Sequence, residues 1–112
     1  MSRRLPQLNA AMQQMIAEIV SQKIEVPFEY FITITKVDCA PDVKTAKVFI
    51  SVLPFNQAEE GQKFMRRQRA EIQRQLAPKM KTKFLPILNF FIDDSNEVAN
   101  NIYSQLDALE QA

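Results

Sequence analysis

The apolar residues near the N-terminus recur every three or four positions. The stripe consists of Leu8, Met12, Met15, Ile16, Ile19 and Val20. This period predicts an amphipathic helix over about residues 7–23, in which the methionines fill space in the core. The residue before a proline is displaced from helical backbone angles, so this helix should end before Pro27.

Two stretches then alternate apolar and polar residues and are rich in β-branched side chains. They are "YFITITKVDCA" (residues 30–40) and "TAKVFISVL" (residues 45–53). The alternation predicts two strands, and Pro41 and Asp42 between them are typical turn residues. A connection this short favours an antiparallel hairpin.

The alternation changes phase inside the first of these strands. Ile32 and Ile34 share one parity, whereas Val37 and Cys39 have the other. Successive side chains of a strand point to opposite faces, so an uninterrupted strand cannot place all four on the same side. We therefore expect a β-bulge or a strong twist near residues 35–36.

The helical period returns from about Gln57, with Phe64, Met65, Ile72 and Leu76 on the apolar side, and Pro78 should break or kink this helix. The stretch "PILNFFID" (residues 86–93) predicts a third strand. The stretch "DDSNEVANNIYSQLDALEQA" (residues 93–112) predicts a capped helix, with an apolar stripe at Val98, Ile102, Leu106 and Leu109.

The predicted order is helix, strand, strand, kinked helix, strand, helix. The second and third strands are joined by a helical crossover, so they should lie parallel in one sheet. We expect a single α+β domain over residues 1–112, with a mixed three-stranded sheet covered by helices and with residues 1–6 mobile.

Charge is distributed unevenly along the chain, although the formal net charge is +1. The stretch from Lys63 to Lys83 holds eight Lys or Arg and a single acid, Glu71, whereas no Lys or Arg follows Phe84. On one continuous helix, Lys63, Arg66, Arg67 and Arg74 would lie opposite the apolar side, with Arg69 nearer the flank. The basic residues continue past Pro78 at Lys79, Lys81 and Lys83.

A basic face with so few interspersed acids favours contact with nucleic acid over a merely solvated surface, because Lys and Arg neutralise phosphates and release counterions. The predicted RNA-binding residues are Lys63, Arg66, Arg67, Arg69, Arg74, Lys79, Lys81 and Lys83. A second set comprises Lys36, Lys44 and Lys47 of the hairpin, for which plain exposed lysines are an equal alternative, and Arg3 and Arg4 near the N-terminus.

The composition excludes several classes of function. The chain has no His, one Gly and no Trp, which argues against imidazole or metal chemistry, a Gly-rich phosphate loop and a large aromatic stacking platform. Asp93, Asp94 and Glu97 are interpreted as a strand end and a helix start, and Cys39 as a packing residue. No catalytic residue, metal, cofactor or small-molecule substrate is predicted.

No apolar run approaches the length of about 20 residues that a membrane span needs, and the N-terminus lacks the apolar core of a signal peptide. The single cysteine cannot form an internal disulfide, so a reducing, cytoplasmic setting is expected. We also expect a monomer.

Two blocks of the sequence are familiar. The block "ITITKVDCAPDVKTAKVFISVL" resembles the hairpin of bacterial ribosome-binding factor A, and "LPILNFFIDDS" resembles the third-strand pattern of the same family. The resemblance covers about residues 3–109, with the elements in matching order, and it includes the basic helix between the two blocks.

The resemblance implies a KH-like fold of type II without the GxxG loop of ordinary KH domains. It implies a non-enzymatic cytoplasmic factor that binds the small ribosomal subunit and its rRNA. Such factors assist late maturation and 5′-end processing of that rRNA, and several are needed in the cold.

The chain departs from the family pattern at two places. The Ala-x-Gly at which the family kinks its central helix is matched by Gln68, Arg69 and Ala70, without a glycine, so either the kink is smaller or Pro78 moves the break downstream. The "DPR" that follows the first helix in the family is "VPF" at residues 26–28.

Two other functions remain open at this point. The basic helix would also suit an acidic protein partner, and binding to protein-free rRNA would distinguish that function from RNA recognition. A nuclease is disfavoured by the lack of His and of a metal constellation.

Overall fold

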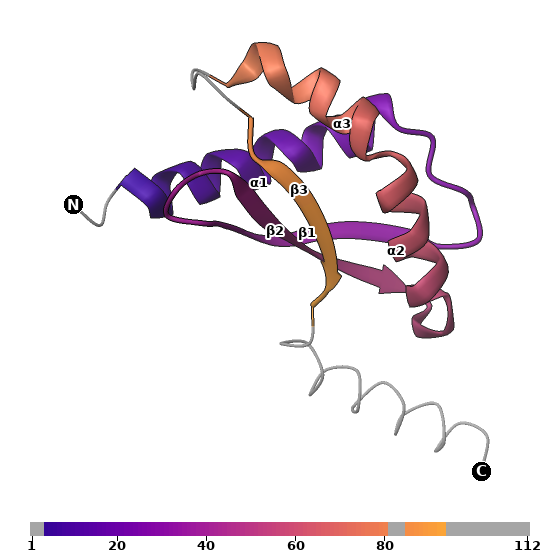
Figure 1. Ribbon diagram of the computed structural model, residues 1–112. Helices are drawn as coiled ribbons and strands as arrows, with labels where there is room; N and C mark the ends of the chain where they lie inside the picture. The colour runs from indigo at the N-terminus through magenta and orange to yellow at the C-terminus, as the bar shows by residue number, and fades with distance from the viewer. Residues whose placement is uncertain (1–3, 81–84, 94–112) are drawn as a thin grey trace.

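The computed structural model describes residues 4–80 and 85–93 of the chain. The described helices lie on one side of a three-stranded sheet (Figure 1). The helices are α1 (Arg4–Lys23), α2 (Ala58–Arg67) and α3 (Arg69–Leu76), with the short 3-10 helices η1 (Phe55–Gln57) and η2 (Ala77–Lys79). The strands are β1 (Phe31–Cys39), β2 (Thr45–Leu53) and β3 (Ile87–Ile92).

The central strand of the sheet is β2. It pairs antiparallel with β1 and parallel with β3, so the predicted hairpin and the predicted mixed sheet are both confirmed. The parallel pairing aligns Thr45 with Ile87 and Ile50 with Ile92. The chain between β2 and β3, which contains α2 and α3, is the crossover that this pairing requires.

A bulge interrupts the pairing of β1 with β2 at Thr35, where the sequence predicts one. Ile34 pairs with Ile50 and Lys36 with Phe49, so Thr35 has no partner in the register. The side chain of Thr35 donates a hydrogen bond to the carboxylate of Asp93 and lies 3.2 Å from the carbonyl oxygen of Phe49. The extra residue lets both halves of β1 bury their apolar side chains.

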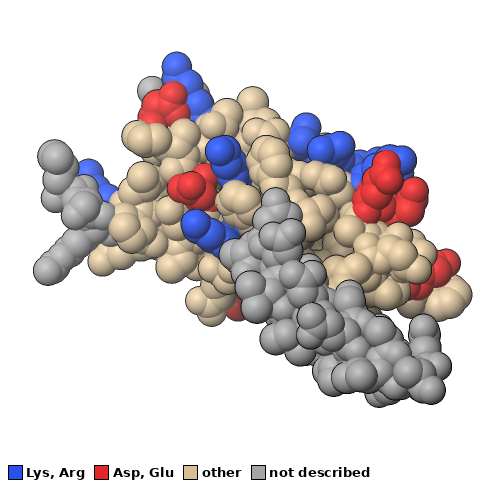
Figure 2. Space-filling model, turned by 90° about the horizontal axis from the view of Figure 1, so that it is seen from below, with Lys and Arg blue, Asp and Glu red and all other residues tan. Residues whose placement is uncertain are grey.

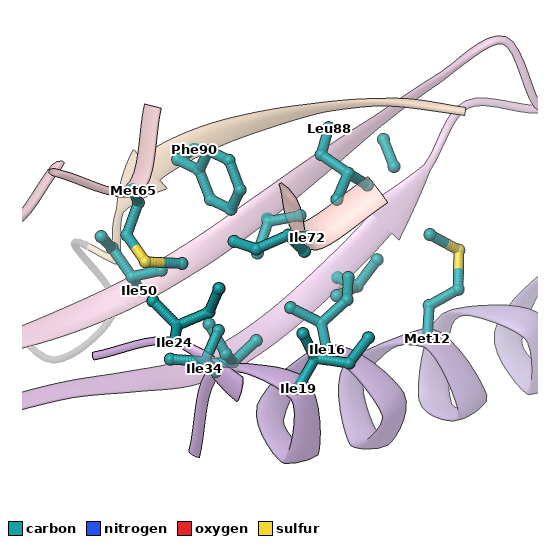
Figure 3. Close-up of a cluster of buried hydrophobic side chains, with 14 of the residues drawn as sticks. Met12, Ile16, Ile19, Ile24, Ile34, Ile50, Met65, Ile72, Leu88 and Phe90 are labelled. Atoms are coloured by element: carbon teal, nitrogen blue, oxygen red, sulfur yellow. The ribbon is translucent and has the colours of Figure 1, made fainter. Parts of the chain in front are cut away.

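The core lies between the sheet and the helices (Figure 3). Every second residue of β2 is at most 1% exposed, namely Ala46, Val48, Ile50 and Val52. These side chains meet Met12, Ile16 and Ile19 from α1, Met65 and Ile72 from the two central helices, and Leu88 and Phe90 from β3. The apolar stripes of the sequence therefore converge on one core, as the α+β prediction requires.

The central helix is interrupted at Gln68, although no glycine or proline stands there. Gln68 has backbone angles of φ −89° and ψ 0°, and its N–H bonds to the carbonyl oxygens of both Phe64 and Met65. Figure 1 shows the chain bending between α2 and α3. The break thus occurs at the position matching the family's kink and is not displaced to Pro78, where η2 ends the helical run.

The start of the first helix differs from the prediction, and the predicted last helix lies almost entirely outside the described residues. The first helix begins at Arg4, three residues earlier than the apolar stripe indicates, so residues 4–6 belong to it. The helix predicted over residues 93–112 lies outside the described residues from residue 94 onward.

The outer edge of β3 is covered by amide side chains from the crossover. Gln62 of α2 donates to the carbonyl oxygen of Phe90 at 2.8 Å, and the side-chain oxygen of Gln73 of α3 accepts from the N–H of Leu88 at 3.4 Å. Two backbone groups of this edge are thus already paired, which disfavours the addition of another strand there.

The close packing of α2 on β2 depends on Gly61. A Cβ at this position would lie 2.8 Å and 3.0 Å from the two methyl groups of Val52. We expect Gly61→Ala to destabilise the fold by about 1 to 2 kcal/mol, because overpacking outweighs the gain of about 1 kcal/mol in helix propensity. Urea denaturation measures the change.

The matched background is Val52→Ala, which removes the obstructing methyl groups. In that background Gly61→Ala should be neutral or stabilising. An equal effect of Gly61→Ala in both backgrounds would show that the contact with Val52 does not limit this position.

Candidate nucleic-acid interface

Three arginines border the break in the central helix. Arg66 and Arg67 form the end of α2 and are exposed, and Arg69 begins α3 and is half-buried. None of the three forms an ion pair with a carboxylate of the described residues. Their charges are therefore available to an external anion.

Lys63, one helical turn earlier, differs from these arginines because two carboxylates lie close to its charge. The ammonium group of Lys63 lies 3.6 Å from a carboxylate oxygen of Glu59 and 3.8 Å from one of Glu60. Both acids precede the basic stretch in the sequence, so counting charges within that stretch overlooks them. Exposed pairs of this spacing are weak individually, but two carboxylates reduce the local positive field of one lysine.

Arg74 is also engaged within its own helix. Its Nε lies 2.8 Å from Oε2 of Glu71, and a terminal nitrogen lies 2.7 Å from Oε1. The hydrogen bond from Arg74, with a smaller contribution from Gln75, lowers the pKa of Glu71 to about 2. Such a two-point arginine–carboxylate pair presents little net charge to a ligand.

The charges of α2 follow the helix dipole. Acids occupy its first turn and Arg66 and Arg67 its last, which stabilises the helix as well as forming a basic surface. Arg69 is the exception, because a cation at the start of α3 is unfavourable for the dipole. Its Nε is also buried, with no hydrogen-bond partner among the described residues.

The remaining predicted contacts are dispersed or outside the description. Lys79 is exposed in η2. Lys81, Lys83 and Arg3 lie outside the described residues. Arg4 is the first residue of α1, at the end of the molecule away from α2 (Figure 1).

The hairpin lysines lie apart from the helical arginines. Lys36 and Lys47 are exposed on the face of the sheet that the described helices leave uncovered. Lys47 pairs in register with Asp38, and the Lys36 ammonium lies 5.8 Å from the ring centre of Phe49. Lys44 sits in the turn, where its N–H donates to the carboxylate of Asp42 at 3.0 Å.

The surface view agrees with this division (Figure 2). A run of Lys and Arg side chains follows one margin, on the side where α2 lies, and ends against a group of acids. Elsewhere on that face the basic side chains are interspersed with acidic ones. Within residues 63–80, Lys63 and Arg74 form ion pairs with described carboxylates, whereas Arg66, Arg67, Arg69 and Lys79 do not.

The uncovered face of the sheet carries more aromatic surface than the lack of Trp suggests. The rings of Phe49 and Phe91 are neighbours, with centroids 6.0 Å apart. Phe31 at the start of β1 is 75% exposed. Phenylalanine thus supplies aromatic surface that the argument from the lack of Trp did not consider.

The structure supports the packing role of Cys39, which is buried and whose N–H donates to the side chain of Asn9 at 2.8 Å. Burial, with smaller contributions from Asp38 and Asp42, raises the pKa of its thiol. Within residues 4–80 and 85–93, no group of His, Cys, Asp and Glu could hold a metal ion. No helix in those ranges is long and apolar enough to cross a membrane.

Comparison with known proteins gives one consistent family. A sequence profile described as "Ribosome-binding factor A" matches residues 4–106. The chain is similar to the ribosome-binding factor A of Staphylococcus epidermidis, with 32% identity over 110 residues that cover 96% of this chain and 94% of that protein. The corresponding protein of Thermodesulfovibrio yellowstonii is 30% identical over 93 residues, covering 83% and 79%.

Two structures are similar in fold. The crystal structure of ribosome-binding factor A from Thermus thermophilus has a TM-score of 0.70 at 19% identity, covering 79% of this chain and 93% of that one. A homology model of the Thermus thermophilus factor, fitted into a cryo-EM map of its complex with 30S, has a TM-score of 0.65 at 20% identity, covering 77% and 91%. At these identities the likeness shows the fold alone, and it confirms the expected KH-like arrangement.

The pairing of Glu71 with Arg74 leads to a prediction about the pKa of Glu71 and the pH dependence of folding. The carboxylate form of Glu71 is the one stabilised, so its contribution to folding is present above its ordinary pKa of 4.5 and is lost as the pH falls toward 2. We expect Arg74→Gln to return the pKa of Glu71 toward 4.5. Carbon-detected NMR titration of the glutamate carboxyl groups measures it, and an unchanged pKa would contradict the pairing.

Proposed function

The chain belongs to the ribosome-binding factor A family, and we propose on that basis that it binds the small ribosomal subunit through its rRNA. The observation that supports the site is the group of unpaired arginines at the α2–α3 break. A related factor of similar fold has been fitted into a map of a complex with 30S, which supports the same partner for this chain.

The arginines would act mainly on the RNA backbone. Arg66 and Arg67 are exposed at a bend, so their guanidinium groups can reach phosphates from two directions. Contacts of this kind release counterions and read the shape of A-form RNA without identifying individual bases. Arg69 follows Arg66 and Arg67 at the start of α3, and Lys79 lies beyond the far end of that helix, in η2.

The proposed role is assistance in late maturation of small-subunit rRNA, including processing of its 5′ end, in the cytoplasm and with a particular requirement in the cold. The family is one of ribosome-binding factors and not of enzymes. We propose that this chain likewise acts as a monomer by binding, without catalysis and without a cofactor.

A second function remains a competitor, in which the basic surface meets an acidic protein partner. The unpaired arginines would serve that role equally well. Salt-sensitive binding to rRNA fragments free of protein favours the first function, whereas binding only to intact subunits or to an acidic protein favours the second.

The arginine site is tested by the double variant Arg66→Gln/Arg67→Gln. We expect affinity for purified small subunits to fall about tenfold or more at moderate salt, because two phosphate contacts are lost. The slope of log K against log salt should become shallower by about 1.5. Sedimentation or fluorescence binding across a salt series measures both quantities.

The matched control is Lys23→Glu, which changes the net charge by the same two units at the exposed end of α1. It should leave the salt slope unchanged. Equal losses in the two proteins would mean that net charge, rather than the α2–α3 break, determines binding, and the site assignment would then fail.

The biological role has a separate test. We expect cells that lack this protein to accumulate small-subunit rRNA precursors with unprocessed 5′ ends, more strongly at low temperature, as measured by primer extension. The wild-type gene should restore processing, and the double arginine variant should restore it poorly. Normal processing without the protein would refute the proposed role.

A further inference from the structure

A groove lies at the β1 edge of the sheet, away from β3, between the C-terminal half of α1 and the first half of β1. Its volume is about 520 Å³. Val20 and Ile24 line one side and Ile32 and Ile34 the other, so its walls are largely apolar. None of the predicted RNA-binding residues that the structure describes lines it.

The groove borders a stretch of the β1 edge that no described side chain covers by hydrogen bonding. Farther along β1, the side-chain amide of Gln13 donates to the carbonyl oxygen of Thr35 at 3.1 Å and lies 3.5 Å from that of Ile34. Asn9 likewise accepts from the N–H of Cys39. The edge of β3 is covered in the same manner by Gln62 and Gln73.

Ile32 has no such partner among the described residues. Backbone groups of a strand alternate in direction with a period of two, so Ile32 presents its N–H and carbonyl the same way as Ile34, away from β2. These groups lie beside the groove. An open edge next to an apolar groove is the arrangement by which domains accept an extended peptide as an additional strand.

Large apolar side chains stand exposed at the mouth of the groove. Phe28 is 92% exposed and Phe31 is 75% exposed, and both line the groove. Aromatic side chains exposed around a concave apolar site are typical of an interaction surface.

The charge of the surrounding segment restricts the partner. Residues 17–34 contain three acids, Glu18, Glu25 and Glu29, against one basic residue, Lys23. All three acids are exposed. The segment around the groove is thus negatively biased, although none of the three acids lines the groove itself and the positive charge of Arg67 also acts on Tyr30 in its wall.

The negative charge of this segment disfavours RNA, a second copy of the chain and the chain's own C-terminal segment as occupants of the groove. RNA phosphates would meet three carboxylates. A second copy of the chain would bring three acids from each copy together. Residues 94–112 contain acids and no Lys or Arg, so the chain's own C-terminal segment would be repelled as well.

We propose that the groove binds an extended, basic segment of a protein partner, which adds as a short strand to β1 at Ile32. Its apolar side chains insert between α1 and β1, and its alternating Lys or Arg residues lie opposite the acids of residues 18–29. No described residue of the proposed rRNA contact lines the groove, so the full chain would hold RNA and a protein partner at neighbouring but distinct places.

The test uses a synthetic heptapeptide with lysine at its odd positions and valine or isoleucine at its even positions. With the full-length protein, we expect saturable NMR shifts of groove residues and slower hydrogen exchange at the Ile32 amide. An analogue with glutamate in place of lysine should bind about tenfold more weakly or worse. Methylation of the peptide's backbone nitrogens should weaken binding about three- to tenfold by removing strand pairing.

Two variants locate the site. Ser21 lines the groove, whereas its neighbour Gln22 is exposed on α1 and does not. Ser21→Leu should fill the groove and abolish peptide binding, and Gln22→Leu, the matched control, should not. Arg66→Gln/Arg67→Gln should retain peptide binding, so failure of the rRNA proposal would leave this one standing.

Several results would overturn the proposal. They are equal binding of the acidic peptide, shifts confined to the uncovered face of the sheet, no saturable binding of the basic peptide, and loss of binding in Gln22→Leu as in Ser21→Leu. Displacement of the peptide by an rRNA fragment in the double arginine variant would instead assign the groove to RNA.

Discussion

The parallel pairing of β2 with β3 is the constraint on which the remaining architecture depends. Parallel neighbours cannot be joined by a tight turn, so the chain must leave the end of β2 and return to the start of β3 over one face of the sheet. The two central helices are that return path, and Gly61 lets the first of them approach β2 closely. The bend at Gln68 redirects the path toward α1, and it is this bend that carries the arginines.

The distribution of charge follows from the same path. Each central helix pairs part of its own charge internally, through Lys63 with the acids before it and through Arg74 with Glu71. Arg66 and Arg67 lie one turn beyond the lysine that pairs with Glu59 and Glu60, and the interruption between the helices separates them from Glu71. The result is a small unpaired cationic site within a chain of nearly zero net charge, which is an arrangement suited to local phosphate contact rather than to diffuse attraction.

Much of the fold could be predicted from the periodicity of the sequence, because burial imposes it. The change of parity between Ile34 and Val37 predicted the bulge, and the apolar stripes predicted which residues meet in the core. The break at Gln68 could not be derived from local preference, since no glycine or proline stands there; α2 packs on β2 and β3, whereas α3 packs on α1. The hydrogen bonds from Gln13 and Gln62 to the strand edges could not be predicted from the sequence either, because each glutamine contacts a strand 20 or more positions away.

Tyr30 connects the groove to the helix that carries Arg66 and Arg67. It lines the groove beside β1, and its ring packs edge-on against Phe64 of α2 at 6.3 Å. Burial raises the pKa of its hydroxyl, and the nearby positive charge of Arg67 acts in the opposite direction. A ligand in the groove that displaces this ring also acts on the helix that presents the arginines. If both proposed ligands bind and one of them moves this ring, their affinities are linked, and each changes the affinity of the other by the same factor.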